Sequence, residues 1–520
     1  MQRLTDFSGF AQAQAHCSKQ ALWELLDGDR EALNITHECL DRHRGKGEAV
    51  RVCRADGSSD AWSFDELADA AARFAHLLRD KGIGPGERVA IMLEPSFAFY
   101  ASFFGAMKAG CTAVPLFTLF GPDGLRLRID DCRPALIVTQ IDKEAVARAV
   151  PGPEILLADE SFETRLAAFP SDFTAGTASA DMAMYQYTSG TTRALPEAVH
   201  HRHRAIVTVM LSALYATGVR PGERFLCPSS PAWGHGLWHG TLAPLALGVR
   251  IAAWAGRFDG AALLAALARH DIENLSAAAT HYRMMKNAGV PTPEGLAVRK
   301  LSFTGEPIDS DTLAYCRDTF GDYPRSFYGT TEVGVILAGY PGAEDLQPPA
   351  DALGKPLPGL DVAVRQPDGS ACGVGEIGEI MVRRGEDWVS TRDLGLIDAD
   401  GFFHHRGRAD DVIISAGYTM SAVEIEDVLL KHPAVHEAAV IGVPDEARGH
   451  VVKAFIVTAG APEAGLEAAL QQFTKERLSA HEYPRQIDFV ADLPKTPAGK
   501  VNRKVLRARE AEARAGEQET

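Results

Sequence analysis

The sequence predicts a layered α/β protein that carries a smaller α+β unit near its C-terminal end. Three observations lead to this fold class. Apolar strands alternate with amphipathic helices over most of the chain, short strands separated by glycines begin near Val362, and a further compact unit follows Arg408. The 520 residues are 46% hydrophobic and 23% charged, which is typical of a globular protein with more than one domain.

The alternation is clearest after the first helix signal. Ser63–Glu66 form a capping box, and the amphipathic helix that it opens ends at Gly82. Residues 88–93 and 112–116 are expected to be buried strands with a helix between them. The same pattern recurs farther along the chain, as far as Phe303. Repeated helices and strands indicate sheets that are covered by helices.

A final unit is predicted to begin at about residue 410. Ser421–Glu424 cap a helix, two strands follow at 435–443 and 451–457, and another helix spans about 462–478. This mixture of elements indicates a small α+β domain.

Composition excludes several classes of function. A net charge of −16 argues against a general nucleic-acid or anionic-membrane surface, because both need a basic footprint. The eight cysteines are scattered without a CxxC pair, which favours a reducing compartment and argues against zinc. Residues 1–7 lack a signal pattern, and the apolar region 98–120 is interrupted by Lys108 and Pro115. We expect a soluble cytoplasmic protein that binds neither nucleic acid nor membrane.

Three distant segments carry residues suited to chemistry on a phosphate group. Thr188–Thr192 supply hydroxyls, a flexible glycine and backbone amides that can follow phosphate oxygens. Tyr328–Glu332 supply an aromatic face, hydroxyls and a carboxylate that can ligate Mg²⁺. Lys500 lies on a turn shaped by proline and glycine, where its charge can reach a carboxylate. Each segment alone also fits a polar surface turn, so the combination carries the inference.

Together these segments resemble the acyl-adenylate-forming superfamily of acyl-CoA synthetases, carrier-protein adenylation domains and luciferases. The resemblance covers nearly the whole chain, with its landmarks in the family's order. It implies a large multi-layer N-terminal domain, residues 1–409, with α/β subdomains and a small β-barrel-like part. It also implies a small mobile α+β lid, residues 410–520, and the use of ATP, Mg²⁺ and CoA.

The resemblance assigns roles to residues at matching positions. Lys500, Glu332 and Thr188 are implied to be catalytic, with Glu332 as the ligand of Mg²⁺, and Gly305–Pro307 match the adenine wall. The residues implied to bind the nucleotide are Thr188, Ser189, Gly190, Thr191, Thr192, Gly305, Glu306, Pro307, Tyr328, Gly329, Thr331, Asp393, Arg408 and Lys500.

The sequence departs from the family pattern at two places. After Thr192 the family usually continues as glycine, any residue, proline and lysine. Here Arg193 replaces the glycine, one extra residue is present, and Glu197 replaces the lysine, although Arg193 would restore the lost positive charge. Arg392, beside the ribose-contacting position Asp393, stands where the family commonly has glycine.

Further residues match the lid and the acyl site of the family. Arg408 matches the second ribose contact, Asp410 the hinge, and Gly417 and Tyr418 the tunnel for CoA. The acyl pocket is expected to involve four residues, of which the first three belong to aromatic and histidine-rich loops: Trp233, His235, His281 and Gly329.

The resemblance implies an ATP-dependent, AMP-forming acyl-CoA ligase. Relatives that activate acetate place a tryptophan at the position of Gly329, so glycine implies an acid larger than propionate, either medium-chain or aromatic. One alternative is loading of a carrier-protein phosphopantetheine. Another is a nucleotide-binding protein that has lost turnover, as Arg193 and Glu197 suggest. A second copy of the chain and a lysine acetyltransferase acting on Lys500 are further expected partners.

Overall fold

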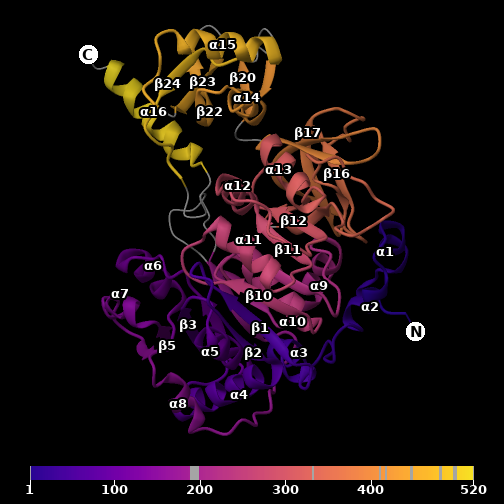
Figure 1. Ribbon diagram of the computed structural model, residues 1–520, viewed down its shortest axis with the longest axis vertical. Coiled ribbons are helices and arrows are strands. Elements are labelled where there is room, and N and C mark those ends of the chain that lie inside the picture. The colour runs from indigo at the N-terminus through magenta and orange to yellow at the C-terminus, as the bar shows by residue number, and fades with distance from the viewer. Residues whose placement is uncertain are drawn as a thin grey trace. The chain divides into compact units, whose positions relative to one another are not determined.

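The computed structural model of the chain describes residues 2–187, 198–330, 333–408, 412–415, 418–445, 449–458, 460–478, 483–495 and 501–518. Its elements are shown in Figure 1. The chain divides into two compact units, Met1–Gly359 and Leu360–Thr520. The predicted domain boundary at residues 409 and 410 falls inside the second unit, and it stays a prediction about which residues move together.

A six-stranded sheet lies in the first unit. Its strands are parallel except for the last pair, which is antiparallel. In spatial order they are β6 (Glu154–Leu157), β5 (Leu136–Thr139), β3 (Arg88–Met92), β4 (Thr112–Pro115), β7 (Met182–Tyr187) and β8 (Ala198–Arg202).

A nine-stranded sheet forms the other half of the first unit. Its central strands are parallel, and β2, β14 and β15 run antiparallel to their neighbours at the two edges. The spatial order is β15 (Lys355–Pro356), β14 (Gly334–Ala338), β13 (Arg325–Thr330), β12 (Lys300–Thr304), β11 (Asn274–Ala278), β9 (Arg224–Cys227), β10 (Arg250–Trp254), β1 (Glu48–Cys53) and β2 (Ser59–Ser63).

Two helices connect these sheets. α4 (Phe64–Asp80) packs on α5 (Phe97–Lys108), and while α4 contacts β1 and β2 of the larger sheet, α5 contacts β3 and β4 of the smaller one. The other helical segments of this unit are η1 (Leu4–Asp6), α1 (Phe10–His16), α2 (Lys19–Trp23), α3 (Ile35–Cys39), η2 (Asp41–His43), α6 (Pro122–Cys132), η3 (Ile141–Lys143), α7 (Glu144–Arg148), α8 (Phe162–Ala167), α9 (Ala205–Tyr215), η4 (His235–Leu242), α10 (Ala243–Ala246), α11 (Gly260–Arg269), α12 (Ala279–Asn287) and α13 (Ser310–Phe320).

Local sequence signals explain where α4 begins and ends. The Glu66 amide donates to Ser63 Oγ at 3.2 Å and the Ser63 amide donates to Glu66 Oε2 at 2.7 Å, so the predicted capping box is confirmed. Beyond the C-cap, Gly82 has φ +75°, a conformation that suits glycine. The apolar face of the helix, which includes Leu67 and Phe74, is fully buried.

The second unit begins with an antiparallel sheet and ends with an α+β part. The first sheet consists of β16 (Val362–Arg365), β17 (Gly378–Arg384), β18 (Asp387–Ile397) and β19 (Phe403–Arg408), and it is the expected small β-barrel-like part. The remaining elements are β20 (Val412–Ser415), β21 (Tyr418–Ser421), α14 (Ala422–Leu429), β22 (Val435–Asp445), β23 (Gly449–Thr458), α15 (Leu466–Arg477), β24 (Gln486–Phe489) and α16 (Arg503–Gln518).

The sheet β22–β23–β24 has a hydrophobic core on each face. Val440 belongs to one core, with side chains from α14 and α15, and its neighbour Ile441 belongs to the other, with Leu506 of α16. Alternating residues of a strand point to opposite faces, so helices cover both sides of this small sheet. The predicted α/β class with a smaller α+β C-terminal part is therefore confirmed.

The cysteines and the apolar helices bear on the environment of the protein. All eight cysteines are free thiols. In the described parts of the chain, no helix combines the length and the apolar character that crossing a membrane requires.

Candidate active site

All three residues predicted to be catalytic lie outside the described residues. Strand β7 ends at Tyr187, immediately before the predicted phosphate loop. The predicted residues outside the described ranges are Thr188, Ser189, Gly190, Thr191, Thr192, Arg193, Glu197, Thr331, Glu332, Asp410, Gly417 and Lys500. Their roles stay predictions, and the site is built here from the residues around them.

The first unit brings several predicted site segments to one edge of its larger sheet. β9, β11, β12 and β13 are adjacent and parallel, so their carboxyl ends share an edge. Trp233 and His235 follow β9, His281 follows β11, Gly305–Pro307 follow β12, and Tyr328 lies near the end of β13. Ligands of open α/β sheets bind at the carboxyl ends of the strands, which makes this edge the candidate active site.

His235 ties these strands together from inside the protein. Its Nδ1 lies 2.9 Å from Ser229 Oγ, and its Nε2 lies 2.9 Å from Ser276 Oγ on β11. Ser302 Oγ on β12 donates to Ser276 Oγ at 2.9 Å, and the ring of Phe327 on β13 lies 5.3 Å from the imidazole. Sequence reasoning missed Ser276 and Ser302, because isolated serines inside apolar strands carry no motif.

The segment that begins at His235 is helical rather than a loop. η4 has the wider π-helical turn, and its two glycines lie against β9 and the residues after it. A Cβ at Gly236 would lie 2.2 Å from the Ser230 carbonyl oxygen, and one at Gly240 would lie 2.9 Å from Cys227 Sγ. The expected aromatic and histidine-rich loops are therefore corrected: a closely packed helical turn starts at His235, and His281 lies on helix α12.

The buried histidines of this edge are uncharged at neutral pH. Burial lowers the pKa of His235 well below its ordinary value, and the neighbouring His239 and His281 lower it further. Burial also lowers the pKa values of His239 and His281 to about 4. The imidazoles therefore serve this region as neutral hydrogen-bonding and packing groups, and they supply no positive charge.

The predicted adenine-wall segment is fixed to helix α12. Thr280 Oγ1 donates to Glu306 Oε1 at 2.7 Å, and Arg283 Nη1 lies 3.3 Å from the same oxygen. Gly305 has φ +102°, a backbone conformation that side chains rarely tolerate. Gly305–Pro307 and the segment around His281 are thus held side by side, as a shared site requires.

Gly329 has a structural role that the sequence did not reveal. It lies on β13, and a Cβ there would be 1.9 Å from the carbonyl oxygen of Gly334 on β14. A larger side chain would therefore disturb the hairpin before it filled any acyl pocket, so Gly329→Trp is unsuitable as a test of pocket size. The predicted place of Gly329 in the acyl pocket stays a prediction.

In the second unit, the two predicted ribose contacts are neighbours. Asp393 on β18 is the cross-strand partner of Arg408 at the end of β19. The Asp393 side chain is buried, and His405 Nε2 lies 3.9 Å from its Oδ1. Sequence reasoning missed His405, whose position became meaningful only through the strand pairing. Arg392 has φ +61°, which explains why glycine suits this position.

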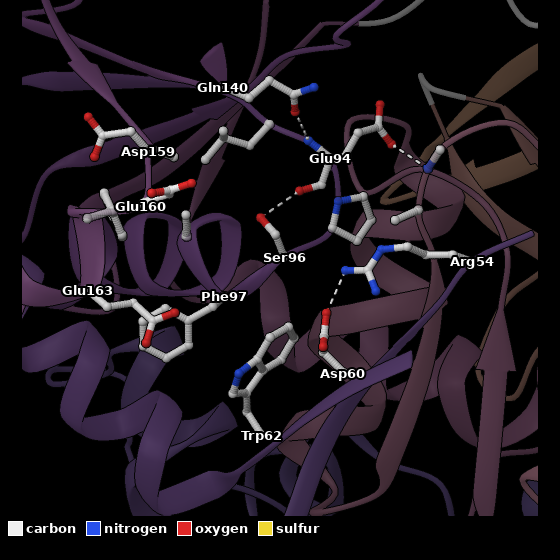
Figure 2. A pocket seen from close by; sticks show the side chains of 17 residues that line it. Arg54, Asp60, Trp62, Glu94, Ser96, Phe97, Gln140, Asp159, Glu160 and Glu163 are labelled. Atoms are coloured by element: carbon white, nitrogen blue, oxygen red, sulfur yellow. Dashed lines mark hydrogen bonds and ion pairs between the residues drawn. The ribbon is translucent and has the colours of Figure 1, made fainter. Parts of the chain in front are cut away.

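A separate cavity of the first unit has the wrong charge for the nucleotide. Figure 2 shows this cavity of about 530 Å³, where Arg54 pairs with Asp60 at 2.6 Å. Several further carboxylates face it, including Glu160 and Glu163. Within the part of the chain that the structure describes, its lining contains none of the predicted site residues. Phosphates of ATP or CoA would be repelled here.

The fold and the site together define a class of enzyme. A mostly parallel sheet whose carboxyl edge gathers aromatic residues, neutral histidines and a GEP turn is typical of an α/β enzyme that binds a nucleotide and an organic substrate.

Comparisons with known proteins identify the family. Residues 40–388 match the model of the AMP-binding enzymes, and residues 424–500 match the model of the C-terminal domain of AMP-binding enzymes. The chain is 30% identical to an uncharacterized acyl-CoA ligase, YtcI, of Bacillus subtilis (strain 168), over 93% of this chain and 97% of that protein.

Solved structures agree with this assignment. A crystal structure of an acyl-CoA synthetase of Brucella canis has a TM-score of 0.73 at 31% identity, over 98% of this chain and 100% of that chain. A benzoate CoA ligase of Burkholderia xenovorans LB400 has a TM-score of 0.78 at 26% identity, over 92% of this chain and 100% of that chain. The chain belongs to the AMP-binding enzyme family. It is an AMP-forming acid–thiol ligase that uses ATP, Mg²⁺ and CoA.

Proposed function

We propose that the enzyme activates a carboxylic acid larger than propionate, medium-chain or aromatic, and transfers its acyl group to CoA. The observation that carries this proposal is the buried, uncharged cluster of His235, His239 and Phe327 beside the carboxyl edge of the larger sheet. Neutral rings of this kind suit an acyl group that is itself uncharged and large enough to contact them. The similarity to a benzoate CoA ligase supports the aromatic alternative.

The proposed reaction has two steps. The carboxylate attacks the α-phosphorus of ATP and pyrophosphate leaves, and then the thiol of CoA displaces AMP from the acyl-adenylate. Because the first step brings anions together, catalysis depends mostly on positioning and electrostatic stabilisation. In this proposal Lys500 supplies the positive charge, Glu332 binds the Mg²⁺ that accompanies ATP, and Thr188 contacts a phosphate.

A panel of acids tests the substrate class. We expect pyrophosphate release with hexanoate and benzoate to exceed release with acetate, and we expect succinate to be inactive because the neutral histidines offer no partner for a second carboxylate. Each acid is measured with and without CoA. Preference for acetate would contradict the proposed size of the acid. If no acid of the panel supports pyrophosphate release, the result would favour a nucleotide-binding protein without turnover.

Lys500→Ala tests the division between the two steps. We expect pyrophosphate release to fall by about a hundredfold or more, because the substitution removes a charge that stabilises the transition state. Thioester formation from supplied acyl-AMP should be nearly unchanged. An equal loss in both steps would contradict the role. Acetylation of Lys500 by a lysine acetyltransferase would remove the same charge and should inhibit the same step.

A substitution in the proposed CoA tunnel tests whether the acyl acceptor is CoA. Gly417→Leu should block the transfer to CoA while pyrophosphate release in the first step persists, because a side chain would obstruct the pantetheine. Thioester formation on an added carrier protein, but not on CoA, would favour the carrier-loading alternative. A homodimer is a separate proposal, and light scattering on the purified enzyme tests it.

A further inference from the structure

The residues on the two sides of the segment that carries Lys500 are joined to each other. Lys495 and Val501, on either side of residues 496–500, are partners in an antiparallel bridge. The Asn502 amide donates to the Pro494 carbonyl oxygen at 2.7 Å, directly beside this bridge. Lys500 itself lies outside the described residues, and residues 494–495 and 501–503 flank its segment on the two sides.

Glu426 on α14 provides one attachment through described residues. Its carboxylate accepts hydrogen bonds from Arg503 Nη2 at 2.5 Å and Arg503 Nε at 3.2 Å, and Oε1 also accepts the Val440 amide at 2.7 Å. Glu426 is only 8% exposed, and a bidentate pair with arginine is among the stronger hydrogen-bonded contacts in proteins. One carboxylate thus joins α14, β22 and the first residue of α16.

A second pair on the other side of the bridge is weaker. Lys495 Nζ lies 2.8 Å from Glu437 Oε1, but the two side chains are 45% and 31% exposed. Exposed ion pairs contribute little, because water and salt screen them. Packing supports both sides of the bridge, since Leu506 in the first turns of α16 and Leu493 before the bridge are both buried in one core.

We propose that Glu426 is a positioning residue for acyl-adenylate formation. Through Arg503 it fixes the end of the segment that carries Lys500, so that the lysine charge reaches the reacting carboxylate. This inference rests on the proposed role of Lys500. Glu426 has no part in the second step, because Lys500 acts only in the first.

Glu426→Gln is the direct test. It keeps the size of the side chain but removes the charge that pairs with Arg503. We expect kcat for pyrophosphate release to fall by about tenfold to a hundredfold, since small misplacements of a catalytic group have effects of this order. The KM for ATP and the rate of thioester formation from supplied acyl-AMP should stay unchanged.

Glu510→Gln is the matched control. Glu510 lies farther along α16 and pairs with Lys453 at 2.6 Å, a contact similar in kind but remote from the bridge. It should leave both steps unchanged. If Glu510→Gln and Glu426→Gln lower pyrophosphate release equally, the effect is loss of lid stability and the proposal is wrong. Arg503→Lys should show a smaller loss than Glu426→Gln, because lysine keeps the charge but not the bidentate contact.

A double-mutant cycle makes the dependence on Lys500 explicit. In single-turnover measurements, Glu426→Gln should have no further effect in a Lys500→Ala background, because a residue that acts through Lys500 is silent once that lysine is gone. Additive losses would overturn the proposal, as would unchanged adenylation in Glu426→Gln. Failure of the proposed function itself is distinguishable, because the wild-type enzyme would then prefer acetate or release no pyrophosphate with any acid.

Discussion

At the scale of single residues, Arg392 departs from the family pattern at a position with an unusual backbone conformation. Arg392 occupies a left-handed backbone conformation, φ +61°, at a position where the resemblance leads one to expect glycine. Such a conformation costs a residue with a side chain about 1 kcal/mol. The sequence marked Arg392 as a departure, but only the backbone angle shows what the departure costs.

Arg392→Gly should therefore be more stable than Arg392→Ala by about 1 kcal/mol, because both lose the guanidinium and only glycine relieves the left-handed backbone. Urea denaturation of the two variants measures the difference. Equal stability, or a more stable alanine variant, would show that the backbone adapts without strain.

Buried histidines should make the enzyme sensitive to mild acid. His203 is fully buried, its Nδ1 accepts the Ile35 amide at 3.1 Å, and burial lowers its pKa to about 4 from 6.5. Above pH 6.5 the residue is neutral in both the folded and the unfolded states. Between pH 6.5 and 4 the unfolded chain binds a proton that the folded protein does not, so stability falls by about 1.4 kcal/mol per pH unit for this group.

His203→Asn keeps a hydrogen-bond acceptor and removes the titration. We expect a lower free energy of unfolding at pH 7 but a shallower decline between pH 6.5 and 5 than in the wild type. Parallel slopes for His203→Asn and wild type would show that His203 does not contribute to acid sensitivity.

At the scale of elements, features that depend on nearby residues could be predicted from the sequence, and features that depend on distant residues could not. The capping box at Ser63 and the strands at 88–93 and 112–116 follow from nearby residues, and β3, β4 and α4 confirm them. The strand order of the nine-stranded sheet could not be predicted, because β1 pairs with β10 across a long stretch of sequence. The helical turn at His235 also depends on distant packing, since its glycines fit against β9 and the segment that follows it.

Gly236→Ala should test whether η4 supports the acyl site. The new Cβ would lie 2.2 Å from the Ser230 carbonyl oxygen, so the turn that carries His235 must shift. We expect a raised KM for the acid with an unchanged KM for ATP. Gly105→Ala is the control, since its Cβ would lie 2.7 Å from Phe74 Cβ between α4 and α5, away from this edge. It should lower stability by about 1–3 kcal/mol without changing the preference among acids.

At the scale of the whole molecule, the sequence predicted the fold class and the order of its parts. The boundary of the C-terminal unit differs between the contacts and the resemblance. Contacts divide the chain at Gly359, whereas the hinge expected from the resemblance lies at Asp410. The difference concerns the sheet β16–β19, which carries Asp393 and Arg408. A boundary read from motifs marks where the chain is expected to pivot, while contacts mark where packing is sparse, and the two need not coincide.

The fragment 410–520 should fold on its own. Both faces of its sheet β22–β24 are covered by helices from within the fragment, and among the described residues no member of its two cores precedes Ile413. We expect a cooperative thermal transition by circular dichroism. Leu470→Ala should lower its free energy of unfolding by about 2–5 kcal/mol, because Leu470 is fully buried in one of these cores. If 410–520 is unfolded while 360–520 folds, the small sheet β16–β19 is part of the C-terminal domain, and the boundary at residue 410 is wrong.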